Sequence, residues 1–549
     1  MIDIKITFDD ETVKEYKSGT TVYQVAENYQ TKMEHDIIGA KINNEIVAMN
    51  TKLTKDSHLS FIDVTDPYGY RMYQAALKFI FEVAVKMCFS NVEVNFLHSV
   101  PKGIMAEIKG NKSIIKDDLN LIKEKMNTLI HEDEKITKYN VVRKDAIAYF
   151  ESHNQHEKAQ NVHNTNNEII SFYKLKDYYN YYYTELPYST KKINKYELVY
   201  LGKNKIVLVY PSSRTDGSVP EYVHYNNIID TFEEGKNWLE VMKVPYLSNL
   251  NEQISSSKIK GLIEANELVF NHHISKVANI IHEKRDVKIV LISGPSSTGK
   301  TTTNKRLSSY LKTLGYDTIP ISVDDYYKDR EQTPIKENGE YDFESLNAID
   351  TKMFNQDLKD LLDGKEVYLP VYDFVIKKKN RGSNPVKMTS NSILLIEGLH
   401  CLNDELTSEV ENKYKYKIYL SPFIPLGIDR HNYVSTVDLR LLRRIVRDNR
   451  TRGTNVSETI KLWQSVREGE EKYIFPYIHQ ADIVINTAYS FEIGVMKVFV
   501  EPLLYSVGLD SPFYEEARRL IKSLQGFYPI PSEYISKDSI LREFIGKGE

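Results

Sequence analysis

Short apolar runs bounded by polar or glycine-rich segments organise the second half of the chain. They cover residues 288–293, 318–323, 392–396 and 416–421 and are rich in Ile, Val and Leu. Runs of this length are typical of strands buried on both faces of a parallel sheet. Because segments with helical character separate them, the pattern predicts an α/β domain over residues 287–505, with helices on both faces of the sheet.

The beginning of the chain follows a different pattern. Residues 2–8 alternate apolar and polar side chains, as a half-buried strand does, and further strands are expected over 37–42 and 58–62. A short helix is expected over 22–30. We therefore predict a small β-rich domain at residues 1–64.

Two further regions precede the parallel sheet. A helix over 70–88, with Ala75, Ala76, Phe79 and Val83 on its apolar side, opens a second α+β domain. Apolar residues at helical spacing over 259–283 predict a helical connector. We place these regions at residues 67–235 and 236–286, and a C-terminal helical extension at 506–549.

A glycine-rich turn follows the first apolar run and precedes a helical segment. It fits the pattern G-x-x-x-x-G-K-[ST], in which the two glycines let successive amides turn towards phosphate oxygens. The amino end of the following helix favours the same anions. The pattern predicts that ATP phosphates are bound by Gly294, Pro295, Ser296, Ser297, Thr298, Gly299, Lys300, Thr301 and Thr302.

Acidic residues follow two other predicted strands. Asp324 comes after the run at 318–323, and Glu397 comes directly after the run at 392–396. The carboxyl ends of parallel strands share one edge of the sheet, so both acids should lie beside the phosphates. Together with the Thr301 hydroxyl they are candidate Mg²⁺ ligands, and Asp324 could also take a proton from an attacking hydroxyl.

Arginine is the only basic residue between Asp438 and Gly453, where leucine and isoleucine recur at helical spacing. Arginine favours bidentate contacts with oxyanions over the single-point contact of lysine. We therefore expect a lid over transferring phosphates. We assign Arg444 and Arg447, together with Lys300, to catalysis and Arg452 to the nucleotide. A solvated basic helix is the alternative.

Three of these segments together resemble the uridine kinase / phosphoribulokinase family, over roughly residues 287–500. They are residues 321–327 (ISVDDYY), 343–348 (FESLNA) and 370–374 (PVYDF). The resemblance implies that Asp324 is the general base for a nucleoside 5′-hydroxyl and that Glu344 holds the ribose hydroxyls. It further implies substrate contacts for Tyr327, Tyr372, Phe374, Lys377 and Arg444. The family's uridine and cytidine kinases have a histidine where this chain has Lys377, so the preferred base stays open.

The first two regions also resemble known domains. Residues 1–64 resemble the ubiquitin-like, β-grasp TGS domain of threonyl-tRNA synthetases, and residues 67–235 are similar to the editing-type second additional domain of those enzymes. Its zinc-type site needs a His-x-x-x-His pair and a later Cys/His pair, which residues 69–73 and 181–190 lack. We expect the fold without the metal chemistry. The domain order resembles bacterial nucleoside kinases that carry these domains ahead of the kinase.

Composition narrows the choice of partners and compartment. The net charge is −4, and residues 1–200 hold 26 basic and 28 acidic residues, so tight nucleic-acid binding is not favoured. The sequence has two cysteines, no signal-peptide pattern and no long apolar run, which favours a cytoplasmic protein without membrane contact. We expect the histidines at 153, 156 and 163 to be solvated and the tyrosines at 178–188 to pack within the fold, rather than to bind metal or bases.

The sequence therefore predicts an ATP- and Mg²⁺-dependent kinase for a nucleoside 5′-hydroxyl, with uridine or cytidine preferred. One alternative is an RNA-associated regulatory NTPase whose N-terminal domains contact RNA. Another is a kinase that acts on a phosphorylated sugar. The sequence leaves open whether the protein forms a homo-oligomer.

Overall fold

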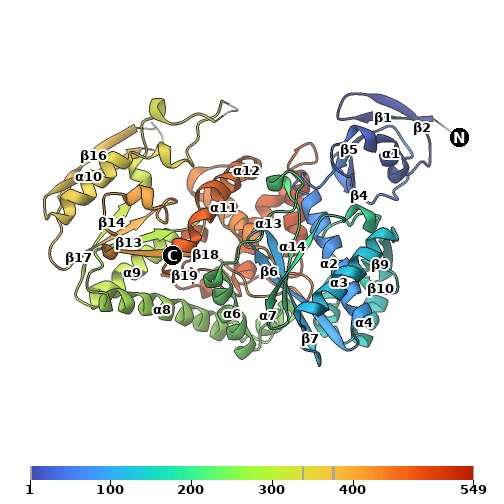
Figure 1. The fold of residues 1–549 in the computed structure, drawn as a ribbon, viewed down its shortest axis with the longest axis horizontal. Coiled ribbons are helices and arrows are strands. Elements are labelled where there is room, and N and C mark those ends of the chain that lie inside the picture. Colours follow the sequence, from blue (N-terminus) through green and yellow to red (C-terminus); the bar gives the residue numbers. More distant parts are fainter. Residues whose placement is uncertain (1–2, 337–338, 374–377, 548–549) are drawn as a thin grey trace.

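The computed structural model describes residues 3–336, 339–373 and 378–547 of the chain. The molecule is elongated, with a small N-terminal sheet at one end and a larger parallel sheet at the other (Figure 1). A second α+β region lies beside the N-terminal sheet, and a group of helices extends from it to the parallel sheet (Figure 1).

The N-terminal sheet forms from alternating strands, as predicted. Its order is β2-β1-β5-β3-β4, and β1 and β5 run parallel to each other. Helix α1 covers it with Val22, Val25 and Ala26, which are buried against Ile4 and Ile6. The elements are β1 (Asp3–Phe8), β2 (Val13–Lys17), α1 (Val22–Tyr29), β3 (Gly39–Ile42), β4 (Glu45–Val47) and β5 (Ser57–Ile62).

The second region contains two antiparallel sheets, β11-β12-β7-β6 and β10-β9-β8. Helix α2 is buried over most of its length because its apolar residues contact the core on several sides. The elements are α2 (Gly69–Cys88), β6 (Val92–Val100), β7 (Gly103–Gly110), α3 (Lys116–His131), β8 (Thr137–Val142), α4 (Arg143–Ser152), α5 (His156–His163), β9 (Ile169–Leu175), β10 (Tyr178–Asn180), β11 (Glu197–Gly202) and β12 (Lys205–Val209).

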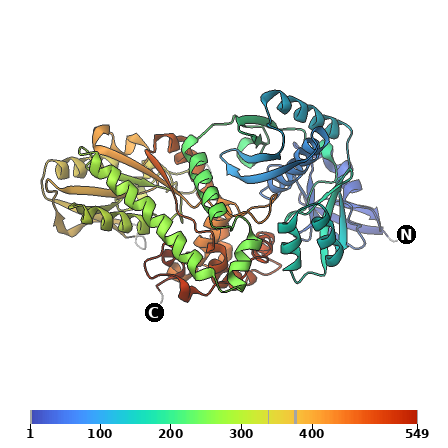
Figure 2. The same ribbon diagram turned by 90° about the horizontal axis from the view of Figure 1, so that it is seen from below.

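Three helices connect this region to the parallel sheet: α6 (Asn226–Val241), α7 (Leu247–Ser255) and α8 (Ile259–Glu283). The boundary expected between residues 235 and 236 falls inside α6. We therefore propose that the connector begins at residue 226. Helix α8 runs along the molecule to the parallel sheet (Figure 2), and its residues Val277, Ala278 and Ile281 are part of the core beneath that sheet.

The parallel sheet has the order β14-β17-β13-β18-β19. Alternate residues of β13 point to opposite faces: Val290 and Ile292 join one core cluster, and Ile289 and Leu291 join another. The first cluster is shared with α8, α9, α11 and α13 and the second with α10, which explains why the strands are apolar throughout.

The elements of this part are β13 (Ile289–Ser293), α9 (Lys300–Thr313), β14 (Asp317–Ser322), α10 (Thr351–Leu362), β15 (Val367–Asp373), β16 (Lys378–Val386), β17 (Ser392–Glu397), β18 (Lys415–Ser421), α11 (Thr436–Arg452), α12 (Val456–Tyr473), β19 (Ile483–Asn486) and α13 (Glu492–Tyr505).

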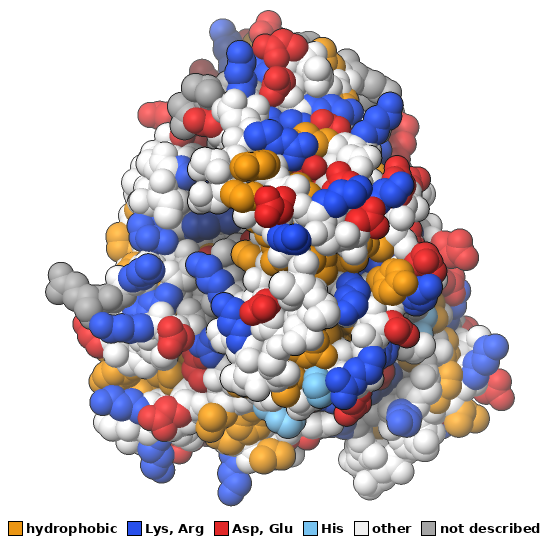
Figure 3. Space-filling model, turned by 90° about the vertical axis from the view of Figure 1, so that its left-hand side faces the viewer, with side chains coloured by type: hydrophobic (Ala, Val, Ile, Leu, Met, Phe, Trp, Pro, Cys, Tyr) orange, Lys and Arg blue, Asp and Glu red, His pale blue; other side chains and the backbone are white. Residues whose placement is uncertain are grey.

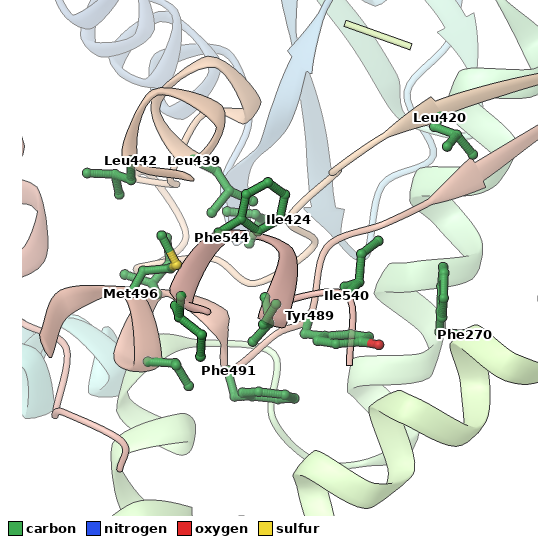
Figure 4. Packing of buried hydrophobic residues seen from close by; sticks show 14 of the residues in the cluster. Phe270, Leu420, Ile424, Leu439, Leu442, Tyr489, Phe491, Met496, Ile540 and Phe544 are labelled. Carbon is green, nitrogen blue, oxygen red and sulfur yellow. The ribbon is translucent and has the colours of Figure 1, made fainter. Parts of the chain in front are cut away.

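The C-terminal segment packs onto the same domain. It contains α14 (Tyr514–Leu524) and the short helix α15 (Arg542–Ile545). Ile540 and Phe544 are fully buried, and Figure 4 shows them among Leu439 and Leu442 of α11 and Phe491 and Met496. The C-terminal segment is therefore part of the main hydrophobic core.

The surface shows no strong separation of charge at the end of the molecule that carries the parallel sheet, where basic and acidic side chains are intermixed (Figure 3). Within the described ranges, no helix combines the length and apolar character needed to cross a membrane. Tyr181 and Tyr182 are buried, as expected for packing residues, and Tyr181 donates a hydrogen bond to Asp429 at 2.7 Å.

Candidate active site

The glycine-rich turn joins the end of β13 to the first residue of α9. Gly294 is needed because a Cβ there would lie 2.7 Å from the Leu420 carbonyl oxygen. Ser297 and Gly299 have φ angles of +63° and +84°, so the backbone changes direction twice before the helix begins. The Ser297 hydroxyl is buried and has no hydrogen-bond partner among the described residues. The turn has the strained form that brings amides together around an anion.

Lys300 curls back over this turn. Its Nζ donates to the carbonyl oxygens of Gly294 at 2.8 Å and Pro295 at 3.3 Å. In the described part of the chain it forms no ion-pair contact with a carboxylate, so its charge is available to a phosphate. Thr298 closes the turn by donating to the Pro295 carbonyl at 2.9 Å.

Thr301 and Glu397 lie beside each other at the carboxyl edge of the sheet. The Thr301 hydroxyl donates to Glu397 Oε1 at 3.0 Å. Strand pairing places Glu397 opposite Ile292 of β13 and Ser322 of β14. Burial raises the pKa of Glu397, whereas Lys300 and the hydrogen bond from Thr301 lower it. These oxygen donors suit Mg²⁺, which prefers carboxylate and hydroxyl ligands together with phosphate oxygens.

Asp324 lies two residues beyond the end of β14, in a 3-10 turn. Its side chain reaches solvent, but surrounding segments limit its hydration and raise its pKa. Lys300 and Arg452 oppose that shift, and Asp325 adds to it. Asp325 has a separate contact, because its Oδ1 accepts from the Tyr372 backbone amide at 3.2 Å. Of these two adjacent aspartates, Asp324 is therefore the one whose pKa Lys300 lowers.

Glu344 approaches the same group from a different loop. Burial is the main cause that raises its pKa to about 7; Glu470 and Asp324 raise it further, and Arg444 and Lys300 lower it. Gly469 of α12 makes room for this side chain, since a Cβ there would lie 2.7 Å from Glu344 Cβ. Contact with Gly469, which is distant in the sequence, thus helps to position the Glu344 carboxylate.

Two tyrosines predicted to contact the substrate lie together. The rings of Tyr327 and Tyr372 are 5.6 Å apart, and Tyr327 donates to the Phe343 carbonyl at 2.9 Å. Nearby Asp324 and Glu344 help to raise the pKa of Tyr327, after burial. The other two predicted substrate residues, Phe374 and Lys377, lie outside the described residues.

Helix α11 carries the predicted lid arginines, and they share one carboxylate. Asp448 is buried and forms ion pairs with Arg444 at 3.2 Å, Arg447 at 2.7 Å and Arg452 at 3.7 Å. Arg444 also donates to the Ser296 hydroxyl at 3.2 Å. Asp448 can neutralise only one of these three positive charges, so positive charge remains to bind a phosphate group.

The remaining arginines of the first half of α11 lie in the core and do not belong to the predicted lid. Arg440 and Arg443 are fully buried and bind Glu470 and Glu492 in the core. They also donate to the carbonyl oxygens of Ser296 at 2.9 Å and Ser297 at 3.2 Å, so they brace the turn from behind. Their roles depend on acids that are distant in sequence, which is why the arginine pattern alone did not separate them.

The C-terminal segment also reaches the turn, which sequence reasoning missed. Glu543 accepts hydrogen bonds from the Thr302 backbone amide at 3.2 Å and the Thr302 hydroxyl at 2.7 Å. A Cβ at Gly299 would lie 2.3 Å from Ile540 Cδ1. Arg450 holds the segment by donating to the carbonyl oxygens of Glu543 and Phe544. No local signal in residues 539–546 indicates this contact.

Comparison with known proteins finds two segments of the chain that match family models. Residues 4–63 match the TGS domain, and residues 289–493 match the Phosphoribulokinase / Uridine kinase family. A threonine–tRNA ligase from Caldanaerobacter subterraneus is 28% identical over 174 residues, which cover 32% of this chain and 27% of the ligase. The chain thus spans about a quarter of the length of that relative.

Relatives of the second half are matched over nearly their full length. A uridine kinase from Ligilactobacillus salivarius is 28% identical over 198 residues, 36% of this chain and 84% of the relative. One from Macrococcus caseolyticus is 28% identical over 219 residues, 39% of this chain and 97% of the relative. The chain therefore carries a kinase domain of the phosphoribulokinase / uridine kinase family, together with an N-terminal TGS domain.

Proposed function

We propose that this protein transfers the terminal phosphoryl group of ATP to the 5′-hydroxyl of a nucleoside, with uridine or cytidine as the candidate acceptors. The glycine-rich turn carries the proposal: Lys300 lies over it without a carboxylate contact in the described part of the chain, and the adjacent Thr301 hydroxyl donates to Glu397 at 3.0 Å. The similarity to proteins named uridine kinase supports the choice of acceptor.

The residues around the turn fit a nucleoside triphosphate. Lys300 has no carboxylate contact in the described part of the chain, and the amides of residues 294–302 lie at the amino end of α9. Thr301, Glu397 and Asp324 would hold Mg²⁺, which stabilises charge on the transferring group when it is bound. Arg444, Arg447 and Arg452 would add positive charge on the opposite side.

Asp324 and Glu344 would act on the nucleoside. Asp324 accepts the proton of the 5′-hydroxyl, and its raised pKa brings its basicity closer to that of a general base at neutral pH. Glu344 accepts hydrogen bonds from the ribose hydroxyls, and Tyr327 and Tyr372 provide flat surfaces beside them. Catalysis then depends on positioning and electrostatics, as is general for phosphoryl transfer.

The test is ATP consumption with a panel of nucleosides, using the native chain and Asp324→Asn. We expect uridine or cytidine to stimulate turnover and the variant to lower kcat by about 10²- to 10⁴-fold, the usual contribution of a general base. Asp325→Asn is the matched control because an asparagine oxygen can still accept from the Tyr372 amide. ATP consumption that is indifferent to every nucleoside, or that a phosphorylated sugar stimulates instead, would refute the proposed acceptor.

The N-terminal half gives a reason to propose RNA as a second partner. Its similarity to a threonine–tRNA ligase favours contact with structured RNA, whereas the balanced charge of residues 1–200 does not. Binding of the full chain to tRNA over a range of salt concentrations would test this. The two free thiols, Cys88 and Cys401, fit the reducing cytoplasm that we propose as the location.

A further inference from the structure

An interdomain cavity, whose lining includes no residue of the glycine-rich turn, lies between the N-terminal half and the kinase domain. Its volume is about 360 Å³, within the range of small-molecule sites. Helix α2 and the loop between β6 and β7 line one side, and the beginning of α11, the end of α12 and α14 line the other. A ligand in this cavity would touch both halves of the molecule.

The lining of the interdomain cavity is cationic. It contains six lysine or arginine side chains and two acids, Asp438 and Glu471. Both acids are already engaged, because Asp438 pairs with Arg519 at 2.6 Å and Glu471 with Arg214 at 2.6 Å. Two acids outside the lining, Glu516 and Glu470, also pair with Arg71, Arg519 and Arg467. In the described part of the chain, the lining cations without a carboxylate partner are therefore Lys78 and Lys102, and these would favour an anion.

Some of the donors in the cavity lack partners. Arg467 Nε is buried and has no hydrogen-bond partner among the described residues, and Lys102 forms no ion pair in that part of the chain. Lys78 is 5% exposed, and the only acceptor within hydrogen-bond distance of its Nζ in the described chain is the His431 carbonyl oxygen, at 2.9 Å. An unpartnered buried donor is costly unless a ligand or water satisfies it.

Tyrosine rings provide the remaining walls. Tyr182 and Tyr210 come from the N-terminal half, and Tyr433 comes from the kinase domain. The Tyr433 hydroxyl forms a hydrogen bond at 2.7 Å with the hydroxyl of Ser99 in β6, across the boundary between the two halves. Aromatic rings favour a planar group, and the cations favour phosphate or carboxylate. The combination fits a small organic anion with a planar ring, and a nucleoside monophosphate has that chemistry.

Buried ion pairs connect this cavity to the glycine-rich turn. Arg467 lines the cavity and pairs with Glu470, which is fully buried. Glu470 in turn accepts from Arg440 Nη1 at 2.9 Å, and Arg440 Nε donates to the Ser296 carbonyl at 2.9 Å. A ligand that draws Arg467 into the cavity would weaken its hold on Glu470 and change how Arg440 braces the turn.

We propose that the interdomain cavity binds a nucleoside monophosphate and that its occupancy alters ATP affinity through Arg467, Glu470 and Arg440. The coupling rests on the proposed function, because it assumes that ATP binds at the turn. Binding in the cavity does not depend on that assumption.

The first measurement is equilibrium dialysis with labelled UMP, CMP, AMP and GMP, using the full chain with Lys300→Ala to weaken binding at the turn. We expect saturable binding of at least one of these nucleotides. Combining Lys102→Glu with Arg214→Ala should weaken it at least tenfold, and Lys116→Glu, an exposed change on α3, should not. Absence of binding, or binding unaffected by the cavity substitutions, would overturn the proposal.

The second measurement tests the coupling without using activity. The affinity of the native chain for a fluorescent ATP analogue is measured with and without the saturating monophosphate. We expect a shift of threefold or more in the native chain, and we expect Glu470→Gln, which leaves the cavity lining unchanged, to abolish it. A chain that binds the monophosphate in the cavity but shows no shift would refute the coupling alone. A chain that binds no ATP analogue at all would instead contradict the proposed function.

Discussion

Glu344 shows how strongly the surroundings of one side chain can change its chemistry. Its segment has the local sequence of an exposed loop, yet α12 packs against it at Gly469, and burial raises its pKa to about 7. A carboxyl group with this pKa is mostly protonated at pH 6 and mostly ionised at pH 8. Only the ionised form can accept hydrogen bonds at both oxygens from two ribose hydroxyls.

We therefore expect kcat/KM for the nucleoside to rise about tenfold between pH 6 and pH 8, as Glu344 loses its proton. Glu344→Gln should lower kcat/KM and flatten this rise, because the amide does not titrate. Initial rates at subsaturating nucleoside across that pH range provide the measurement. A rise that persists unchanged in Glu344→Gln would assign the titration to another group, such as Asp324.

At the scale of elements, α15 is the helix that brings the C-terminal segment into contact with the glycine-rich turn. It is too short to be stable alone, and burial of Ile540 and Phe544 in the main core holds it in place. Its Glu543 carboxylate accepts from the Thr302 amide at the amino end of α9. The carboxylate thus accepts a hydrogen bond from a backbone amide at the end of α9 where phosphates are expected to bind.

Glu543→Gln should increase the affinity for ATP by about two- to fivefold, because a charge at a helix terminus contributes roughly 0.3–1 kcal/mol and repels an incoming phosphate. KM for ATP, measured at saturating nucleoside, should fall accordingly. Glu533→Gln is the matched control, since Glu533 is exposed and belongs to the same C-terminal segment. A higher KM in Glu543→Gln would mean that the carboxylate supports the nucleotide site instead.

At the scale of the whole molecule, a buried polar network joins the N-terminal half to the kinase domain. His431 Nδ1 lies 2.7 Å from both Lys158 Nζ and Asn180 Nδ2, and all three side chains are buried. Burial lowers the pKa of His431 well below its ordinary value, an effect increased by Lys158, Lys86, Arg430 and Lys78. Glu82, 3.5 Å from Nδ1, is the acid that faces the ring. The imidazole is therefore neutral and accepts from Lys158.

This network should make the protein sensitive to acid. Because the folded-state pKa of His431 is depressed, its contribution to stability is present above pH 6.5 and is lost as the pH falls below that value. We expect the free energy of unfolding to fall by about 1.4 kcal/mol between pH 7.5 and pH 5.5 from this group alone. His431→Asn keeps an acceptor and should reduce that loss. Urea unfolding at both pH values provides the measurement, and an equal loss in the variant would exclude His431 as its source.

The sequence alone determined the features that depend on local spacing. The β-branched runs fixed the parallel sheet because strands buried on both faces must be apolar throughout, and the glycine-lysine turn could be recognised because its backbone angles require those residues. Helix α8 was predicted with its observed bounds because its apolar residues recur at helical spacing. The sheet edge then brought Asp324 and Glu397 beside the turn.

Only the tertiary structure decided which charged groups meet. Arg440 and Arg443 look like Arg444 and Arg447 in the sequence, yet Glu470 and Glu492 draw the first pair into the core while Asp448 holds the second pair near the surface of the site. The contact between Glu543 and Thr302, and the lining of the interdomain cavity, likewise bring together residues that are hundreds of positions apart. Such contacts depend on how separate elements pack and not on the local pattern, so no spacing rule reveals them.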